Sequence, residues 1–296
     1  MGLGSSVNSM LAAPESKWYA PWQQKEHAVR FSFREALDDR NLVRLYETLN
    51  DVRLLKERFR IGPPMTLLEV GCATGDFYRY LRLALPHLSY CGLDLSPAAV
   101  ERARSKYPEG NFLACEPGSQ MLRVWEEKSG CRKADLVYAS DVLHHQTEPF
   151  TFLCQLLRLA SVAVLLRCRT RDVGPTEWNA ARSRQLNYGG SVPYIVINME
   201  ELIGRIRREA PSAEVVVHRS RVVLGDRYGR RLPPACSLRR TGTAETSVGI
   251  FLKTDRPGSL SIRDRRDNRP NTTWDHKLRS LLGRLRVLRL NGGTGV

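Results

Sequence analysis

The chain has 296 residues, of which 42% are hydrophobic and 26% are charged, and both fractions are ordinary for a folded globular protein. Its longest apolar run, residues 159–166, is too short to span a bilayer, and the N-terminus lacks the basic-then-apolar pattern of a secretory signal. We therefore predict a cytoplasmic protein with no transmembrane segment. The formal net charge of +15 makes an anionic partner plausible without identifying one.

The cysteines indicate reduced thiols rather than a disulfide framework or a metal site. Their number is odd and no two are spaced as Cys-x-x-Cys. Most of them lie in apolar, strand-like runs: Cys72, Cys91, Cys115, Cys131, Cys154, Cys168 and Cys236. This pattern is typical of a reducing compartment. We predict that the chain binds no metal.

Residues 1–60 are predicted to form an N-terminal arm followed by a helical cap. The arm is of mixed composition up to about residue 30. Residues 33–59 then carry apolar side chains at spacings of three and four, which predicts one amphipathic helix or two; these are Leu42, Leu45, Leu49, Val52 and Leu55. The Gly-Pro-Pro sequence at 62–64 ends this region.

Residues 61–255 are predicted to form one α/β domain, because strand-like and helix-like segments alternate along them. The expected strands are residues 65–70, 89–95, 111–115, 134–140 and 161–168, and the expected helices between them are 76–85, 96–106, 119–128 and 150–159. Ser96 is a good helix cap with Pro97 behind it. Such alternation indicates a parallel sheet that is covered by helices on both faces.

The pattern changes after residue 171. Residues 172–197 show no clear periodicity, and Asn198 then caps a predicted helix over 199–210. Two further predicted strands, 213–224 and 246–254, flank an arginine-rich loop and close the domain.

Residues 256–296 form a basic tail with ten Lys or Arg against three acids. One apolar stripe in it predicts an amphipathic helix, formed by Trp274, Leu278, Leu281, Leu285 and Leu288. Three interpretations stay open: a helix docked on its own domain, a helix on a membrane surface, and a contact for RNA or an acidic partner.

The motif LLEVGCATGDF at residues 67–77 places small residues two apart after an apolar strand. Small residues at a strand end allow a ligand to approach the backbone closely. A dinucleotide site would need Gly-x-Gly-x-x-Gly, but counting from Gly71 puts Ala73 at the second place and Asp76 at the third. A carboxylate beside a pyrophosphate would be repelled, so an NAD-linked oxidoreductase is disfavoured.

The pattern acid-x-Gly-x-small-x-Gly, formed by Glu69, Gly71, Ala73 and Gly75, resembles the class I S-adenosylmethionine-dependent methyltransferases. The resemblance covers roughly residues 60–255 and includes the segment ADLVYASDVLHH after residue 133. It implies a doubly wound, Rossmann-like sheet of seven strands, mostly parallel, with an antiparallel last strand. It also implies S-adenosylmethionine as the cofactor, lying under the N-terminal helical cap.

The resemblance implies a role for each matching residue. Glu69 would accept a hydrogen bond from the methionine ammonium, and Asp94 from both ribose hydroxyls. Leu95 would pack on the adenine, and Glu116 would contact its amino group. The remaining implied contacts are the loop residues Gly71, Cys72, Ala73 and Gly75, which approach the nucleoside, and Ser140 and Asp141, which line the pocket beside the methionine and its methyl group.

His144 and His145 are the candidate catalytic residues, with His145 slightly favoured, because imidazole titrates near neutrality and both follow the fourth strand. In the alternative interpretation, one of them shapes the pocket while the other caps the next turn. Tyr188, Tyr194 and Trp178 lie in the segment 172–197, which we expect to cover the acceptor. These aromatic residues either line the acceptor pocket or fill the core.

We therefore predict an enzyme that transfers a methyl group from S-adenosylmethionine to a small molecule or biosynthetic intermediate. The first alternative is an RNA methyltransferase that uses the basic tail, although this tail lacks the interleaved aromatic residues of a single-strand platform. The second alternative is a non-catalytic binding module with the same fold.

Overall fold

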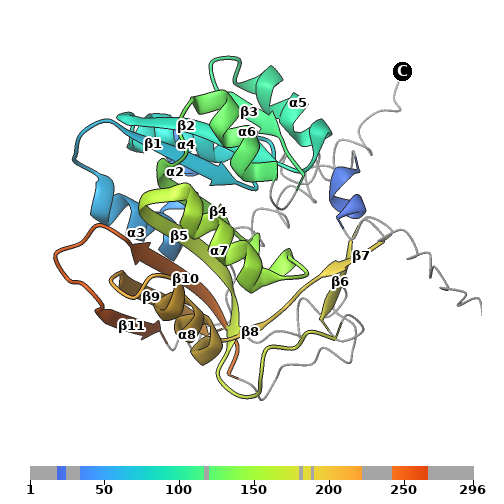
Figure 1. Cartoon of the computed structure of the whole chain (residues 1–296). Coiled ribbons are helices and arrows are strands. Elements are labelled where there is room, and N and C mark those ends of the chain that lie inside the picture. Colours follow the sequence, from blue (N-terminus) through green and yellow to red (C-terminus); the bar gives the residue numbers. More distant parts are fainter. Residues whose placement is uncertain are drawn as a thin grey trace, which may run out of the picture.

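One large sheet organises the part of the chain that the computed structural model describes, which is residues 19–24, 34–116, 120–179, 183–187, 190–221 and 242–265 (Figure 1). Its strand order is β11-β9-β10-β5-β4-β1-β2-β3, and β8 pairs with the end of β5. The strands are β1 (Met65–Val70), β2 (Leu88–Asp94), β3 (Asn111–Ala114), β4 (Ala134–Ser140), β5 (Ala160–Arg171), β8 (Ile197–Asn198), β9 (Glu214–Arg221), β10 (Ala244–Phe251) and β11 (Leu260–Arg265). A separate hairpin joins β6 (Arg184–Asn187) to β7 (Gly190–Pro193).

The predicted fold class is confirmed by the directions of these strands. Strands β3, β2, β1, β4 and β5 run parallel to one another. Strand β10, the last one predicted, runs antiparallel to both β5 and β9. The seven expected strands therefore form a continuous, mostly parallel sheet with one antiparallel member, and β8 and β11 enlarge it.

The sheet continues beyond residue 255, where we expected the domain to end. Strand β11 pairs in parallel with β9 over Leu260–Arg265. Its composition is polar and basic because it is an edge strand, and even its apolar Ile262 is half exposed. The pairing depends on the open edge of β9, which composition alone does not reveal. The predicted amphipathic helix of the tail lies outside the described residues.

The helices follow the predicted alternation closely. The amphipathic stretch before the sheet is divided into α2 (Asp39–Tyr46) and α3 (Asn50–Phe59). The others are η1 (Ala20–Gln23), α4 (Asp76–Ala84), α5 (Pro97–Lys106), α6 (Gln120–Ser129), the short η3 (Leu143–His145), α7 (Pro149–Leu159) and α8 (Met199–Glu209). Ser96 and Asn198 cap α5 and α8 as expected, by accepting hydrogen bonds from Ala99 N and Glu201 N. Among the described helices, none is long and apolar enough to cross a membrane.

Both faces of the sheet are covered, because its central strands are apolar on both sides. Leu67 and Leu68 are adjacent in β1, yet they are buried in two different clusters. The Leu67 cluster contains side chains from α2, α3 and α4, whereas the Leu68 cluster contains side chains from α6, α7 and α8. Figure 1 shows α7 and α8 on one side of the sheet and α3 on the other.

The strand order reverses between β1 and β4, since β1 pairs with both β2 and β4. In open α/β sheets, ligands bind outside the carboxyl ends of the strands at such a reversal. This edge carries the loop after β1, the end of β2 and the turn after β4. These are the segments that contain the predicted site residues.

Candidate functional site

The loop after β1 turns tightly over the end of β2. Gly71 N and Cys72 N both donate to Leu93 O, at 2.7 and 3.0 Å. Gly71, Ala73 and Gly75 all have left-handed backbones, with φ of 86°, 47° and 80°. The small residues that stand two apart in the sequence therefore mark positions with a left-handed backbone. Glycine is strongly preferred in this conformation.

Protein atoms already require glycine at two positions of this loop. A Cβ at Gly71 would lie 2.4 Å from Val142 Cγ2, and one at Gly75 would lie 2.8 Å from the Phe112 ring. The sequence argument ascribed the small residues to a ligand alone. The structure adds that the loop packs directly on the turn after β4 through Gly71 and Val142.

Asp94, at the end of β2, holds the tip of this loop. Its Oδ2 accepts from Ala73 N at 2.8 Å and its Oδ1 accepts from Ser96 N at 2.8 Å. The side chain is only 7% exposed. Because a carboxylate offers about four lone pairs, these two bonds leave capacity for further donors. The next residue, Leu95, is half-buried, and its carbonyl accepts from Gln23 Nε2 at 3.3 Å.

Glu69 lies beside Asp94 as a buried carboxyl group. It is 6% exposed, and Tyr90 donates its hydroxyl to Oε2 at 2.5 Å. Burial raises the pKa of Glu69 to about 8, against the lowering effect of the Tyr90 hydrogen bond, and the negative charge of Asp94 acts in the same direction as burial. A cation that binds beside this buried carboxyl group would favour its charged form.

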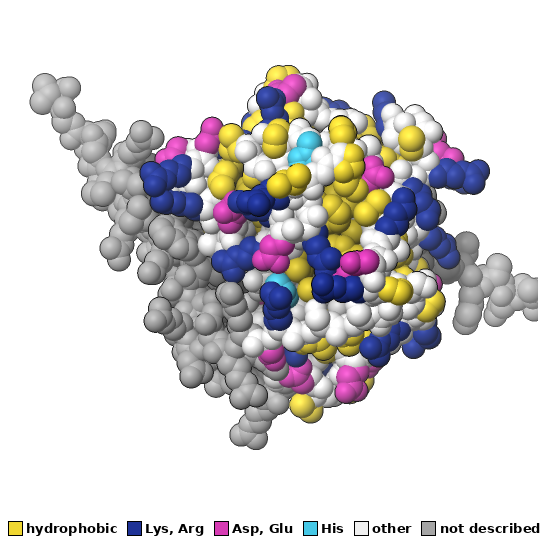
Figure 2. Space-filling view, turned by 90° about the vertical axis from the view of Figure 1, so that its left-hand side faces the viewer, with side chains coloured by type: hydrophobic (Ala, Val, Ile, Leu, Met, Phe, Trp, Pro, Cys, Tyr) yellow, Lys and Arg dark blue, Asp and Glu magenta, His cyan; other side chains and the backbone are white. Residues whose placement is uncertain are grey.

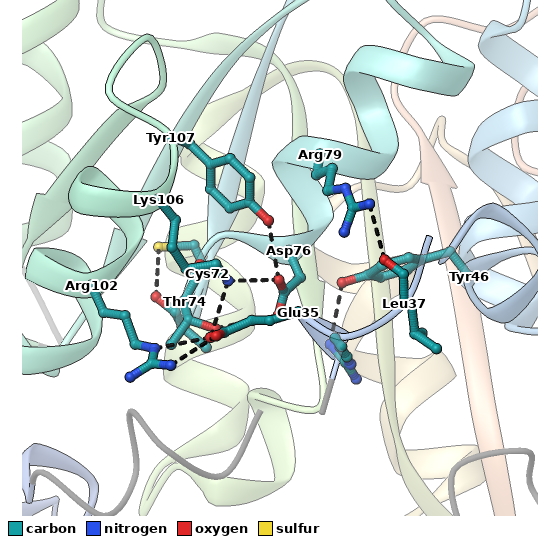
Figure 3. Close-up of polar contacts among 12 residues, drawn as sticks. Glu35, Leu37, Tyr46, Cys72, Thr74, Asp76, Arg79, Arg102, Lys106 and Tyr107 are labelled. Carbon is teal, nitrogen blue, oxygen red and sulfur yellow. Dashed lines mark hydrogen bonds and ion pairs between the residues drawn. The ribbon is translucent and has the colours of Figure 1, made fainter. Parts of the chain in front are cut away.

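An ion-pair network fastens the N-terminal segment to the loop (Figure 3). Lys106 Nζ lies 2.8 Å from Asp76 Oδ1 and 3.3 Å from Glu35 Oε1. Arg102 donates twice to Glu35, at 2.9 and 2.8 Å. Asp76, which argued against a dinucleotide site, is thus a buried carboxylate paired with a lysine of α5. Residues 34–38 consequently lie against the loop, as the predicted cap requires.

Ser140 and Asp141, at the end of β4, are bonded to protein partners. Ser140 Oγ donates to Asp51 Oδ2 at 2.9 Å. Asp141 has a φ of 59° and accepts from Arg167 Nη2 at 2.6 Å and from Arg169 Nη1 at 3.1 Å. These two guanidinium groups hold the pKa of Asp141 well below its usual range, against the raising effect of burial. Their predicted contacts with the methionine stay predictions.

The two candidate catalytic histidines lie together in η3. His144 is 1% exposed, its Nδ1 has no hydrogen-bond partner, and burial keeps its pKa well below the ordinary value, so it is neutral. His145 Nδ1 lies 2.7 Å from Pro193 O. A carbonyl can only accept, so Nδ1 carries the proton and the lone pair of the neutral ring is on Nε2. That is the tautomer a general base needs.

Aromatic side chains from two other segments surround these histidines. Trp22 of η1 meets the His145 ring edge-on at 4.8 Å, and Tyr194 meets the His144 ring at 5.1 Å. Tyr194 was a predicted acceptor residue, whereas Trp22 was not; its signal was the group of bulky residues Trp18, Tyr19 and Trp22 in an otherwise mixed arm. Trp178 contacts Phe150 instead and is 46% exposed. Tyr188 lies outside the described residues.

The remaining predicted residues lie nearby with structural contacts. Cys72 is buried among side chains of α4, α5 and β3, and burial raises the pKa of its thiol. Glu116 lies two residues after β3, which leaves the sheet beside Asp94, since Cys115 N donates to Asp94 O at 2.8 Å. Across the described residues, no cluster of three His, Cys, Asp or Glu side chains could hold a metal ion.

Part of the chain is similar to known methyltransferases. Residues 68–162 match the family model described as a methyltransferase domain. Trans-aconitate 2-methyltransferase of Methylobacterium radiotolerans is 27% identical over 133 residues, which cover 43% of this chain and 48% of that protein. Malonyl-[acyl-carrier protein] O-methyltransferase of Paenibacillus sp. is 26% identical over 95 residues, which cover 31% and 34%. The chain thus spans about half of the first relative and about a third of the second.

Solved structures with related folds include the plantazolicin methyltransferase BamL in complex with a triazolic desmethylPZN analog and SAH, at 15% identity and a TM-score of 0.45, covering 80% of this chain and 93% of that one. The [4+2]-cyclase SpnF matches at 15% identity and a TM-score of 0.46, covering 72% and 80%. The matched methyltransferase domain, the strand order and the acid-x-Gly-x-small-x-Gly turn together support the resemblance to the class I S-adenosylmethionine-dependent methyltransferases.

Proposed function

We propose that this chain binds S-adenosylmethionine at the carboxyl ends of β1 and β2 and transfers the methyl group to a small, acidic molecule. The observation that carries the proposal is the fixed turn of residues 71–75, which Asp94 holds against β2 with Glu69 buried beside it. Two carboxyl groups at one strand edge suit a ligand with an ammonium group and two ribose hydroxyls.

Each residue of this edge has a distinct part in the proposal. Glu69 holds the ammonium group, and its proton leaves when that cation binds, since burial raises the Glu69 pKa to about 8. Asp94 holds the ribose, and Leu95 packs on the adenine. The sulfonium group of the cofactor supplies the electrophilic methyl group.

In this proposal the acceptor lies beside His145, whose ring contacts Trp22 and Tyr194. Methyl transfer depends mostly on alignment and on the exclusion of water, and bulky aromatic groups provide both. A proton must leave only when the acceptor atom is a hydroxyl or an ammonium, and His145 is the base proposed for that step. The names of the two curated relatives both contain acids, trans-aconitate and a malonyl group, which supports an acidic acceptor.

The charge distribution supports a small-molecule acceptor over RNA. On the face drawn in Figure 2, acidic and basic side chains alternate around apolar groups instead of forming one basic field. A uniform basic surface is what phosphate backbones require. A cytoplasmic location is also part of the proposal, and the unpaired thiols of the six described cysteines support it.

Two measurements test the proposed function. Titration calorimetry with S-adenosylmethionine and with NAD should show binding of the first alone; binding of NAD would reject the assignment. Mass spectrometry of metabolites and RNA from cells with and without the gene should then show a methyl-dependent mass gain in the metabolite pool. A gain confined to RNA would favour the RNA methyltransferase, and no gain in either pool would favour a non-catalytic module.

A further inference from the structure

Arg171, the last residue of β5, is a buried cation at the ligand-binding edge of the sheet. Only 8% of the residue is exposed. Its backbone pairs with Asn198 of β8. The guanidinium lies against Gly174, where an added Cβ would be 3.8 Å from Arg171 Cζ. Glycine therefore leaves that face of the guanidinium without a covering side chain.

The guanidinium of Arg171 has no bonded partner within the described parts of the chain. Its Nε is buried without a hydrogen bond, and no ion pair joins it to a described carboxylate. Arg167 and Arg169, on the same strand, differ from it, because both form ion pairs with Asp141 and Glu245. An arginine with five donors is costly to bury without acceptors.

The two nearest acids do not supply these acceptors. Glu177 and Glu201 favour the charged form of Arg171, while burial, the larger effect, lowers its pKa. Glu201 Oε1 instead accepts from Thr176 N at 3.1 Å, and Glu177 Oε1 accepts from Asn179 N at 3.0 Å. The acids thus act on the charge at a distance, while the buried Nε of Arg171 stays without an acceptor.

One short stretch of chain connects Arg171 with the histidines. Pro193 O lies 2.7 Å from His145 Nδ1, and Ile195 N donates to His144 O at 2.8 Å. The same stretch then pairs with the end of β5, at Ile197 and Asn198. Arg171 and the histidine pair therefore lie along one wall at the carboxyl end of the sheet.

We propose that Arg171 binds a carboxylate of the acceptor, which accepts two hydrogen bonds from the guanidinium. This inference rests on the proposed function and adds the residue that recognises the acidic group of the acceptor. Guanidinium and carboxylate match geometrically as a bidentate pair. Such a pair satisfies the orphaned Nε and positions the acceptor away from Glu69 and Asp94, the protein carboxyl groups proposed to bind the cofactor.

Calorimetry with defined probes tests this assignment. Malonate, succinate and trans-aconitate, together with their neutral methyl esters, are titrated into protein saturated with S-adenosylhomocysteine. The variants are Arg171→Gln, Arg171→Lys and Arg184→Gln, of which the last removes the same charge from an exposed position in β6. We expect at least one acid to bind the wild type and its ester to bind more weakly. Arg171→Gln should weaken the acid at least tenfold, Arg171→Lys should weaken it less, and Arg184→Gln should have no effect.

Binding of S-adenosylmethionine to each variant separates the two proposals. If the wild type does not bind it, the proposed function is rejected. If the wild type binds it but binds none of the acids, or if Arg171→Gln binds the acid as the wild type does, the assignment of Arg171 is overturned. Should Arg171→Gln fail to fold, Arg171→Lys is used in its place. If Arg171→Lys binds both the acid and the ester with the affinity of the wild type, the assignment of Arg171 is overturned.

Discussion

The carboxyl ends of β1 and β2 differ from those of β4 and β5 in how their polar groups are satisfied. Asp94 accepts from the backbone of Ser96, two positions away, and of Ala73, 21 positions away. Ser140 instead donates to Asp51, a residue of α3 that is 89 positions away. Asp141 depends on side chains of β5, and His145 depends on the carbonyl of Pro193.

The site therefore consists of two halves, one built mainly from a single stretch of chain and one assembled from several distant segments. The β1–β2 half is built mainly from one short stretch of chain and its own backbone, so a motif can represent it. The β4–β5 half needs α3, β10 and the segment 193–198, and it retains unpartnered buried atoms such as His144 Nδ1 and Arg171 Nε. We infer that the first half determines cofactor affinity and the second determines the acceptor. Four predictions test this division, in decreasing order of their effect on cofactor affinity.

Gly71→Ala should abolish detectable binding of S-adenosylmethionine, because Gly71 joins the two halves through Val142. The left-handed backbone costs an alanine about 1–2 kcal/mol, and the 2.4 Å approach to Val142 Cγ2 adds about 1–3 kcal/mol of overpacking. Gly130→Ala is the matched control, since Gly130 has a φ of 67° and nothing within 4 Å of its added Cβ. Thermal melting and calorimetry should show a small loss of stability and normal binding in the control.

The double variant Gly71→Ala, Val142→Ala sharpens this prediction. Removing the Val142 methyl groups relieves the contact but not the backbone strain, so binding should return in part. A double variant no better than the single one would show that backbone strain, and not the contact between the two halves, controls the loop.

Asp94→Asn should weaken S-adenosylmethionine binding about ten- to hundredfold, the usual value of a hydrogen bond to a charged group. The amide keeps one acceptor oxygen, so it cannot serve both Ala73 N and Ser96 N. Asp135→Asn is the control, because Asp135 accepts from Thr66 N at 2.9 Å at the opposite end of β1. The control should melt at a lower temperature with unchanged cofactor affinity; equal affinity loss in both would indicate a general effect on the sheet.

Glu69 should make cofactor affinity rise severalfold between pH 6 and pH 7.5. Its pKa is raised to about 8 by burial, so the folded protein holds a proton there that must leave when an ammonium group binds. The α-amino group of the ligand stays mostly charged in this range. Calorimetry in two buffers of different ionisation enthalpy should detect proton release in the wild type and none in Glu69→Gln.

The same pKa shift has a consequence for stability, with a definite sign. Between pH 4.5 and about 8 the folded protein keeps the Glu69 proton while the unfolded chain has lost it. The contribution of Glu69 to stability therefore falls as pH rises through that window. The melting temperature of Glu69→Gln should depend less on pH there; an unchanged slope would contradict the raised pKa.

His145→Asn should leave cofactor affinity within about twofold of the wild type and slow turnover of a hydroxyl or ammonium acceptor by about a hundredfold. Asparagine can donate to Pro193 O in place of Nδ1, so the turn is preserved while the base is removed. Rates across pH 6–9 with an identified acceptor provide the measurement. Equal rates of variant and wild type would assign His145 to shaping the pocket, and a large loss of cofactor affinity would contradict the division into two halves.

The sequence by itself determined the mostly parallel α/β sheet, the caps at Ser96 and Asn198, and the position of the small-residue turn between β1 and α4. These features follow from local rules, namely apolar periodicity, N-cap side chains and the backbone freedom of glycine. It also brought Glu69 and Asp94 together, since parallel neighbouring strands end at the same edge.

Only the tertiary structure decided how the second half is built. The pairing of β11 with β9, the contact of Trp22 with His145, the burial of Asp51 beneath Ser140 and the unpartnered guanidinium of Arg171 all depend on which distant segments meet. The physical reason is that hydrogen bonds and burial at these positions involve partners far apart in the chain. No periodicity or spacing within one segment records such partners.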